Sequence, residues 1–224
     1  MEFLKLDKEY VVHVYETGPD LRLNLHSLFD YFQDIASDHA VKLGYGRNDL
    51  MKKNNFWVLS RIYAEITAWP QWGETITIRT WPRGTERLFA LRDFEVRDHK
   101  GKSIARATSS WLIVDRDTRR IQRPDNHLSQ YKTLLSVDKT LPRNAIKLEP
   151  ADPNGRRTQQ FSVRISDLDI NLHTNNSRYL KWVSDSYDLD FILNNIPISA
   201  EINYLAESHF NDTIAITISE EKEN

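Results

Sequence analysis

The 224-residue chain contains no cysteine. This absence excludes disulfide bonds, thiolate metal sites and a cysteine nucleophile, and it is typical of proteins from a reducing compartment. Glycine is also scarce, with seven residues, and the sequence has neither a glycine-rich phosphate loop nor a G-x-S-x-G elbow. Neither a P-loop nucleotide site nor an α/β-hydrolase is therefore expected.

Three further absences narrow the function. The formal net charge is −2, so the chain lacks the basic excess that general nucleic-acid binding requires. No apolar run approaches the ~20 residues that cross a bilayer, and the opening segment MEFLKLDKEYVVHVYE has no signal-peptide core. The seven histidines show no H-x-x-x-H or H-E-x-x-H spacing, so no metal site and no cofactor are expected. These features predict a cytoplasmic globular protein.

Two short motifs recur in the same order in the two halves of the chain. The first motif is RLNLHSLFDYFQDIASD (22–38), which matches DINLHTNNSRYLKWVSD (169–185) at an offset of 147. The second is WGETITIRT (72–80), which matches FNDTIAITI (210–218) at an offset of 138. The first match aligns Asn24 with Asn171 and His26 with His173. The ordered matches indicate an internal duplication in which the second copy has nine residues fewer between its motifs.

Each copy predicts an extended segment, then a helix, then antiparallel strands. The helical positions are Leu28, Phe32, Ile35, Ala36, His39 and Leu43 in the first copy, and Tyr179, Trp182, Val183, Ser186 and Leu189 in the second. One strand face is expected to hold Phe56, Val58, Ser60, Ile62, Ala64 and Ile66, and further strands are expected at 75–81, 87–97 and 103–115. A helix wrapped by a curved antiparallel sheet is an α+β architecture.

The duplication also predicts the domains. We expect an N-terminal unit at 1–127, a linker at 128–156 and a C-terminal unit at 157–224. Counterparts of the first unit's last two strands would fall near 225–235 and 241–253, beyond Asn224. Either the sequence is a piece of a longer chain, or the second sheet has fewer strands, or a partner completes its edge. A bare sheet edge favours pairing with another chain, which predicts self-association as a homodimer.

Asp169, Asn171 and His173 occupy alternate positions just before the second predicted helix, for which Thr174 or Asn175 would be the N-cap. On an extended backbone these three side chains would point to one side. A carboxylate can activate water, an imidazole can move a proton, and an amide or a helix-start N–H can hold an oxyanion. Alternatively, the run only caps the helix and His173 is a hydrogen-bonded core histidine.

The aligned segment of the first copy favours the catalytic interpretation. Arg22 stands there in place of Asp169, and Leu28 and Phe29 stand in place of Asn175 and Asn176. One half keeps polar groups and the other carries apolar ones, as expected for a catalytic half and a ligand-holding half.

The block SDLDINLHTNNSRYLKW resembles the signature of acyl-[acyl-carrier-protein] thioesterases, the tandem hotdog enzymes of plants and bacteria. WPQWGETITIRTW, ALRDFEVRDHKGKSIARATSSWLIVDRDTRRI and AEINYLAES resemble further blocks of this family in the same order, and the likeness runs from about residue 10 to about residue 218. The resemblance implies a tandem double hotdog that hydrolyses fatty acyl-acyl carrier protein (fatty acyl-ACP) to free fatty acid. The N-terminal unit would hold the acyl chain and the C-terminal unit would perform the chemistry. The plant enzymes begin with a transit peptide, and this sequence shows none. The resemblance therefore also implies a bacterial, cytosolic member of the family.

The resemblance places the family's catalytic residues on Asp169, Asn171, His173 and Glu207. The plant enzymes carry a cysteine beside that glutamate, and here the position is Ser208. Cysteine chemistry is therefore excluded and a carboxylate-driven attack is favoured, while Ser208 stays open as a nucleophile or a substrate contact.

Apolar candidates for contacting the acyl chain are Phe29, Phe32, Trp57 and Trp111. The arginines at 83, 87, 92, 116, 119, 120 and 123 form a basic cluster in the sequence. They are interpreted either as a solvated face or as a docking patch for an acidic carrier protein and its phosphopantetheine. Three other functions stay open: an acyl-CoA thioesterase, a non-hydrolytic acyl-binding module and a hotdog dehydratase.

Overall fold

The computed structural model describes residues 4–127, 138–150 and 157–219. The chain divides into two compact units, the first made of Met1–Ile146 with Pro197–Asn203 and the second of Lys147–Ile196 with Tyr204–Asn224. Residues 138–146, which the sequence assigned to the linker, thus lie in the first unit. The rest of the predicted linker falls partly on 128–137 and 151–156, outside the described residues.

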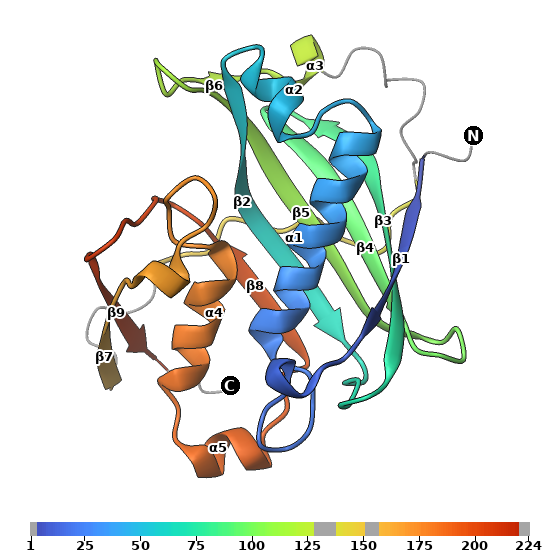
Figure 1. Ribbon diagram of the computed structural model, residues 1–224, viewed down its shortest axis with the longest axis vertical. Coiled ribbons are helices and arrows are strands. Elements are labelled where there is room, and N and C mark those ends of the chain that lie inside the picture. The colour runs from blue at the N-terminus through green and yellow to red at the C-terminus, as the bar shows by residue number, and fades with distance from the viewer. Residues whose placement is uncertain (1–3, 128–137, 151–156, 220–224) are drawn as a thin grey trace. The chain divides into compact units, whose positions relative to one another are not determined.

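The first unit is a helix on an antiparallel sheet (Figure 1). Its strands follow the order β1-β3-β4-β5-β2-β8, with β6 pairing with β5. The strands are β1 Leu6–Val11, β2 Asn55–Ile66, β3 Thr75–Glu86, β4 Phe89–Arg97, β5 Ser103–Asp115, β6 Ile121–Gln122 and β8 Ser199–Asn203. The helices are the 3-10 turn η1 Val14–Glu16, α1 Leu25–Lys42, α2 Arg47–Met51 and α3 Pro124–His127.

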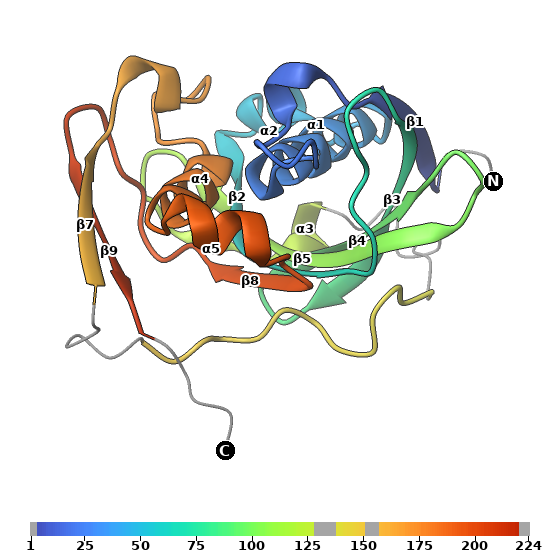
Figure 2. The same ribbon diagram turned by 90° about the horizontal axis from the view of Figure 1, so that it is seen from below.

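Helix α1 supplies the core of the first unit, and the sheet curves around it (Figure 2). All six helical positions predicted for the first copy are buried in α1 or at its C-cap, Leu43. Phe32 packs on Phe94 of β4, with ring centroids 4.8 Å apart. Each such buried side chain contributes about 1.5–3 kcal/mol of transfer free energy, so this apolar face fixes the helix on the sheet.

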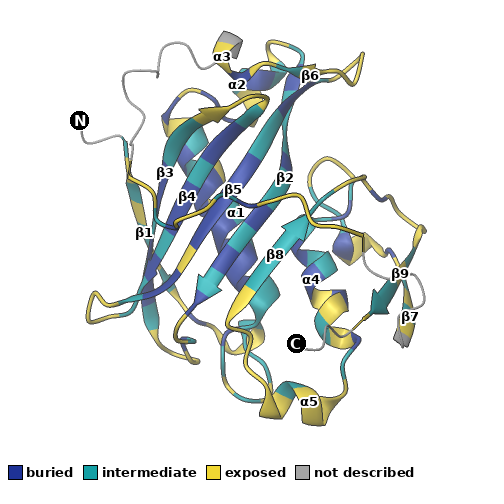
Figure 3. Ribbon diagram, turned by 180° about the vertical axis from the view of Figure 1, so that it is seen from behind, coloured by how far each residue is buried: buried dark blue, intermediate teal, exposed yellow. Residues whose placement is uncertain are grey.

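Burial alternates along the first part of β3, whereas β4 and β5 have adjacent buried residues. Figure 3 shows the buried positions along β2 to β5. The predicted single face of β2 is wrong, because the register shifts between Leu59 and Arg61. This bulge moves the buried side chains to Leu59, and then to Ile62, Ala64 and Ile66.

In its described residues, the second unit consists of a two-stranded sheet and two helices. Its elements are β7 Arg157–Ser162, the 3-10 turn η3 Ile165–Asp167, α4 Asn176–Asp185, α5 Leu189–Asn194 and β9 Thr213–Ile218. Trp182 and Ser186 are buried as predicted, whereas Val183 and Leu189 are exposed. The helix ends at the C-cap Ser186, so Leu189 begins another helix and no longer shares the predicted face.

The structure confirms a repeat but corrects its first register. In both units, strands β1 and β7 lead into a 3-10 turn and then into a small hairpin that is closed by an isolated bridge, Thr17 with Leu23 and Leu168 with Thr174. The offset is therefore 151 residues rather than 147. Both hairpins hold a leucine in the left-handed region at φ 64°, Leu21 and Leu172.

The corrected register changes which residues correspond. His173 is equivalent to Arg22, and Asp169 is equivalent to Gly18. Asn24 is equivalent to Asn175, and both are N-caps of their helices. The sequence alignment of Asn24 with Asn171 was therefore wrong. Both segments contain an Asn-x-His motif, but the hairpin geometry shows that the two motifs are not at equivalent positions.

The second register, at an offset of 138, agrees with the structure. Val11 pairs with Thr75 in the first unit, and Ser162 pairs with Thr213 in the second. Gly73 and Asn211 both have positive φ at the turn before the strand, 82° and 68°. The two copies thus differ by 13 residues, and not nine, between these motifs.

Candidate active site

The Asp-x-Asn-x-His run is a hairpin loop and not an extended strand. The backbone N–H of Asp169 donates to the carbonyl of His173 at 2.7 Å, and that of Leu172 donates to the carbonyl of Asp169 at 3.1 Å. A left-handed residue at the end of a three-residue loop is a common hairpin geometry, and Leu172 has it here. The predicted common strand face of Asp169, Asn171 and His173 is therefore wrong.

Asp169 holds this loop together. Its Oδ1 accepts from the backbone N–H of Asn171 at 2.8 Å and of His173 at 3.2 Å. Its Oδ2 accepts from Nδ2 of Asn171 at 3.3 Å. The carboxylate and the amide are thus brought together, and the carboxylate fixes the backbone from which His173 projects.

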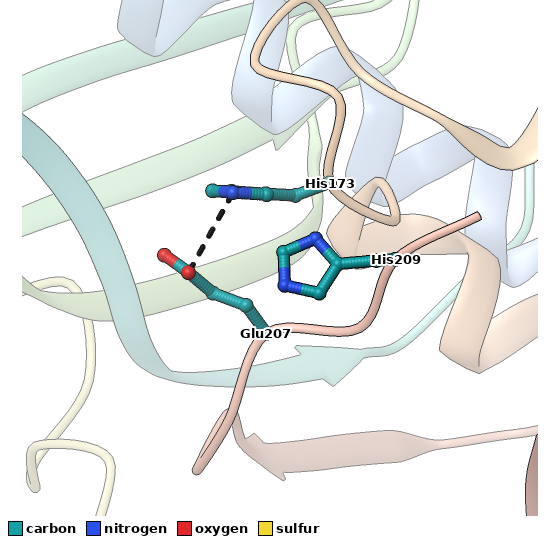
Figure 4. A group of neighbouring side chains, drawn as sticks. All are labelled: His173, Glu207 and His209. Atoms are coloured by element: carbon teal, nitrogen blue, oxygen red, sulfur yellow. Dashed lines mark ion pairs between the residues drawn. The ribbon is translucent and has the colours of Figure 1, made fainter. Parts of the chain in front are cut away.

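His173 faces Glu207, which comes from a segment far along the chain (Figure 4). Its Nε2 lies 3.6 Å from Oε2 of Glu207, which is longer than a hydrogen bond but within ion-pair distance. The side chains of His173 and Glu207 retain 23% and 30% of their accessible area, so both are in contact with solvent.

His209 is the third member of this group, and sequence reasoning missed it. It forms an isolated antiparallel bridge with His173, and the two rings meet edge-on with centroids 5.0 Å apart. Glu207 precedes His209 by two residues, so on an extended backbone both side chains leave on the same side. The spacing Glu-x-His was visible in the sequence, but the cross-strand pairing that brings His173 to it was not.

Ser208 points away from this group. Its Oγ donates to Oγ1 of Thr174 at 2.7 Å and lies 2.6 Å from the hydroxyl of Tyr179 on α4, and the residue is 7% exposed. Its carbonyl accepts from the N–H of Thr174 at 2.8 Å. The structure therefore does not bring Ser208 together with His173 and Glu207, and it gives the serine a role in attaching the hairpin to α4.

The start of α4 is capped by Asn175, one of the two predicted N-caps. Its Oδ1 accepts from the N–H of Ser177 at 2.9 Å, and its own N–H donates to the carbonyl of Asp167 at 2.8 Å. Capping orients the first turn of the helix directly after His173, where its remaining N–H groups carry partial positive charge.

The apolar candidates belong to the first unit and fall into two pairs. Phe29 and Phe32 are buried on α1, with ring centroids 5.6 Å apart. Trp57 and Trp111 are half-buried on β2 and β5 and meet edge-on at 6.5 Å.

The arginine cluster does not form one surface. Arg83 pairs with buried Asp93 at 3.1 Å, and Arg92 contacts Nδ1 of His39 at 3.0 Å, so both are structural. Burial lowers the pKa of Arg92 to about 10. The exposed remainder lies in two places. Arg87 is in the turn between β3 and β4, and Arg116, Arg119, Arg120 and Arg123 lie on the segment that follows β5.

No helix in the described ranges is long and apolar enough to cross a membrane. Among those same residues, His173, Glu207 and His209 are the group whose donor atoms could hold a metal ion, with the donors within 4.8 Å of one another. The expectation of no metal site was based on spacing along one segment, whereas these donors come from two.

Two family descriptions match the chain. The acyl-ACP thioesterase N-terminal domain matches residues 4–131, and the acyl-ACP thioesterase C-terminal domain matches residues 151–224. Among curated proteins, the chloroplastic oleoyl-acyl carrier protein thioesterase of Coriandrum sativum is 27% identical over 231 residues, which cover 94% of this chain and 61% of that protein. Oleoyl-acyl carrier protein thioesterase 1 of Arabidopsis thaliana is 28% identical over 204 residues, which cover 84% of this chain and 56% of that protein. The chain thus spans less than two thirds of these relatives.

Solved structures agree with this assignment. An acyl-ACP thioesterase from Bacteroides thetaiotaomicron superposes with a TM-score of 0.87 at 27% identity, covering 100% of this chain and 90% of that one. The 12:0-ACP thioesterase from Umbellularia californica superposes with a TM-score of 0.88 at 23% identity, covering 98% of this chain and 88% of that one. At this identity the match shows a similar fold. These matches confirm the α+β tandem hotdog architecture.

Proposed function

The chain belongs to the acyl-ACP thioesterase family, and on that premise we propose that it hydrolyses the thioester of fatty acyl-ACP and releases the free fatty acid. The observation that carries the proposal is the approach of His173 to Glu207, at 3.6 Å, on the exposed side of the second unit's hairpin. An imidazole and a carboxylate at this separation can share the proton transfers of a hydrolysis.

In the proposed reaction, Glu207 accepts a proton from water as the water oxygen attacks the thioester carbonyl. The carbon–sulfur bond then breaks, and His173 supplies the proton that the departing sulfur takes up. The products are the carboxylic acid and the thiol of the carrier, so atoms and charge balance. Apo geometry is often looser than the reactive complex, and a small rotation of Glu207 would close the distance.

Asp169 and Asn171 have a different part in this proposal. The Asp169 carboxylate already accepts two backbone N–H groups and the Asn171 amide, so Glu207 is the better candidate for the base. Asp169 sets the position of His173. The Asn171 amide and an N–H at the start of α4 are the proposed donors to the oxyanion.

The division of labour between the two halves is also a proposal. The apolar core around Phe29 and Phe32, together with Trp57 and Trp111, supports acyl binding by the first unit, and the hairpin with Glu207 supports catalysis by the second unit. An acyl carrier protein would dock on the arginines that follow β5. We further propose a cytoplasmic location and a homodimer, with no cofactor required for the hydrolysis.

A thiol-release assay with acyl-ACP substrates of graded chain length tests the proposal, with matched acyl-CoA substrates in parallel. We expect release of thiol from acyl-ACP at a higher kcat/KM than from acyl-CoA. Preference for acyl-CoA would make the chain an acyl-CoA thioesterase, and tight binding without thiol release would make it an acyl-binding protein.

A further inference from the structure

The side chains of His173, Glu207 and His209 converge from two chain segments (Figure 4). His173 and His209 are partners in an antiparallel bridge, and side chains of such partners project to one side with Cβ atoms about 4.5–5.5 Å apart. Glu207 lies two residues before His209 and adds a carboxylate on that side. The common side of these side chains therefore follows from the backbone pairing.

The donor separations match a metal site whose side chains need only small rotations. A tetrahedral zinc with N and O ligands at about 2.0–2.2 Å holds its donors about 3.3 Å apart. Nε2 of His173 and Oε2 of Glu207 are 3.6 Å apart, and all the donors of the group lie within 4.8 Å of one another. Two imidazoles and one carboxylate suit zinc and similar transition metals, whereas magnesium prefers oxygen donors.

We propose that His173, Glu207 and His209 form a binding site for a divalent transition-metal ion of the zinc type, and that this ion inhibits the enzyme. Binding uses the lone pair of the His173 imidazole and the carboxylate of Glu207, the two groups assigned above to proton transfer. Metal binding and catalysis therefore exclude each other. The inhibition rests on the proposed function, whereas the binding does not.

The equivalent place in the first unit carries no such donor set. The corrected register puts Arg22, Trp69 and Gln71 at the positions of His173, Glu207 and His209, with Arg22 and Gln71 joined by the same kind of bridge. An arginine, an indole and an amide are not transition-metal ligands of this kind. The site is thus a property of the second unit's side chains, and one ion per chain is expected.

Equilibrium dialysis of the metal-free, untagged chain against Zn²⁺ tests the site directly. We expect one Zn²⁺ per chain, no binding of Mg²⁺, and at least a tenfold weaker affinity in His209→Gln. His13→Gln is the matched control, because His13 is an exposed histidine 3.1 Å from Glu16 without a second imidazole partner in the pair. Equal zinc affinity in wild type and His209→Gln, or no bound zinc, would overturn the proposal.

Thiol release measured during a zinc titration tests the inhibition. We expect the inhibition midpoint to equal the dissociation constant from dialysis, to be reversed by a chelator, and to rise at least tenfold in His209→Gln relative to that variant's own zinc-free rate. Zinc that binds without inhibiting, or that accelerates the reaction, would contradict it. If the metal-free chain releases no thiol from acyl-ACP, the proposed function fails, and the dialysis result still decides the site.

Discussion

The hairpins at 17–23 and 168–174 have the same backbone and different chemistry. Both close through an isolated bridge, both place a leucine at φ 64°, and both lead into a helix with an asparagine N-cap. In the first hairpin, Arg22 donates to Asp20 at 2.6 Å within the loop. In the second, Asp169 holds the loop from its first position, and His173 is left to face Glu207.

This difference separates what the loop needs in order to fold from what it needs for chemistry. An acid that accepts a backbone N–H is present in both hairpins, Asp20 in one and Asp169 in the other. A carboxylate in the loop is therefore explained by turn formation alone. The imidazole at 173 and the carboxylate at 207 have no such counterparts in the first unit, and they distinguish a site from a turn.

The largest expected effect is the loss of this imidazole or of its carboxylate. His173→Ala and Glu207→Gln should each lower kcat for acyl-ACP hydrolysis by about 10²-fold or more, the usual scale for acid–base groups. Arg22→Ala, at the equivalent place in the first unit, should leave kcat nearly unchanged. Steady-state thiol release measures all three, and near-normal turnover of His173→Ala would remove the proposed mechanism.

A smaller loss is expected at Asp169, which acts through the backbone of His173. Asp169→Ala should reduce kcat by about 10- to 100-fold, because a misplaced catalytic group costs on that order. Asp169→Asn retains an acceptor oxygen and should recover part of the rate. Thermal unfolding should follow the same order, and equal kcat in the two variants would argue against positioning.

The exposed arginines after β5 test the first unit as a docking surface. Reversing the charges of Arg116 and Arg120 to Glu should raise KM for acyl-ACP about three- to tenfold, consistent with two surface charges, while KM for acyl-CoA changes less. Reversing Lys100 and Lys102, in another exposed turn of the same sheet, is the control. If KM for acyl-ACP is equal in the two double variants, the docking patch lies elsewhere.

Ser208 distinguishes a structural hydroxyl from a nucleophile. Ser208→Ala removes a buried hydrogen bond to Thr174 and a part-buried one to Tyr179, and should lower the free energy of unfolding by about 1–3 kcal/mol. Its kcat should stay close to wild type at a temperature below the transition. A fall of about 10³-fold or more, the scale of a missing nucleophile, would assign the chemistry to the serine instead.

The smallest effect concerns the left-handed leucines that both hairpins share. A left-handed conformation costs a leucine about 1–2 kcal/mol, and asparagine tolerates it better. Leu21→Asn and Leu172→Asn should each raise the free energy of unfolding by about 0.5 kcal/mol, measured in urea. Both leucines are exposed, so few apolar contacts are lost. A destabilisation confined to one variant would show that the hairpins are less equivalent than their backbones.

Local patterns in the sequence determined much of the fold. The helical spacing from Leu28 to Leu43 predicted α1, because burial of one helix face is encoded in neighbouring residues. The strand at 103–115, expected after the turn DHKGK, is β5. The repeat at an offset of 138 was also readable, since it includes a turn and a strand. The family motif drew attention to His173 and Glu207 before any geometry was known.

The tertiary structure alone decided the relations between distant segments. The hairpin register depends on a leucine in the left-handed region, a conformation that leucine rarely adopts and that the sequence does not indicate. The alignment on the Asn-x-His motif was therefore wrong by four residues. The bridge between His173 and His209 depends on pairing across separate segments. Ser208 turns inward because Thr174 and Tyr179 offer hydrogen bonds on that face. Side-chain direction in an extended segment is set by what packs against it, and only the folded chain supplies those neighbours.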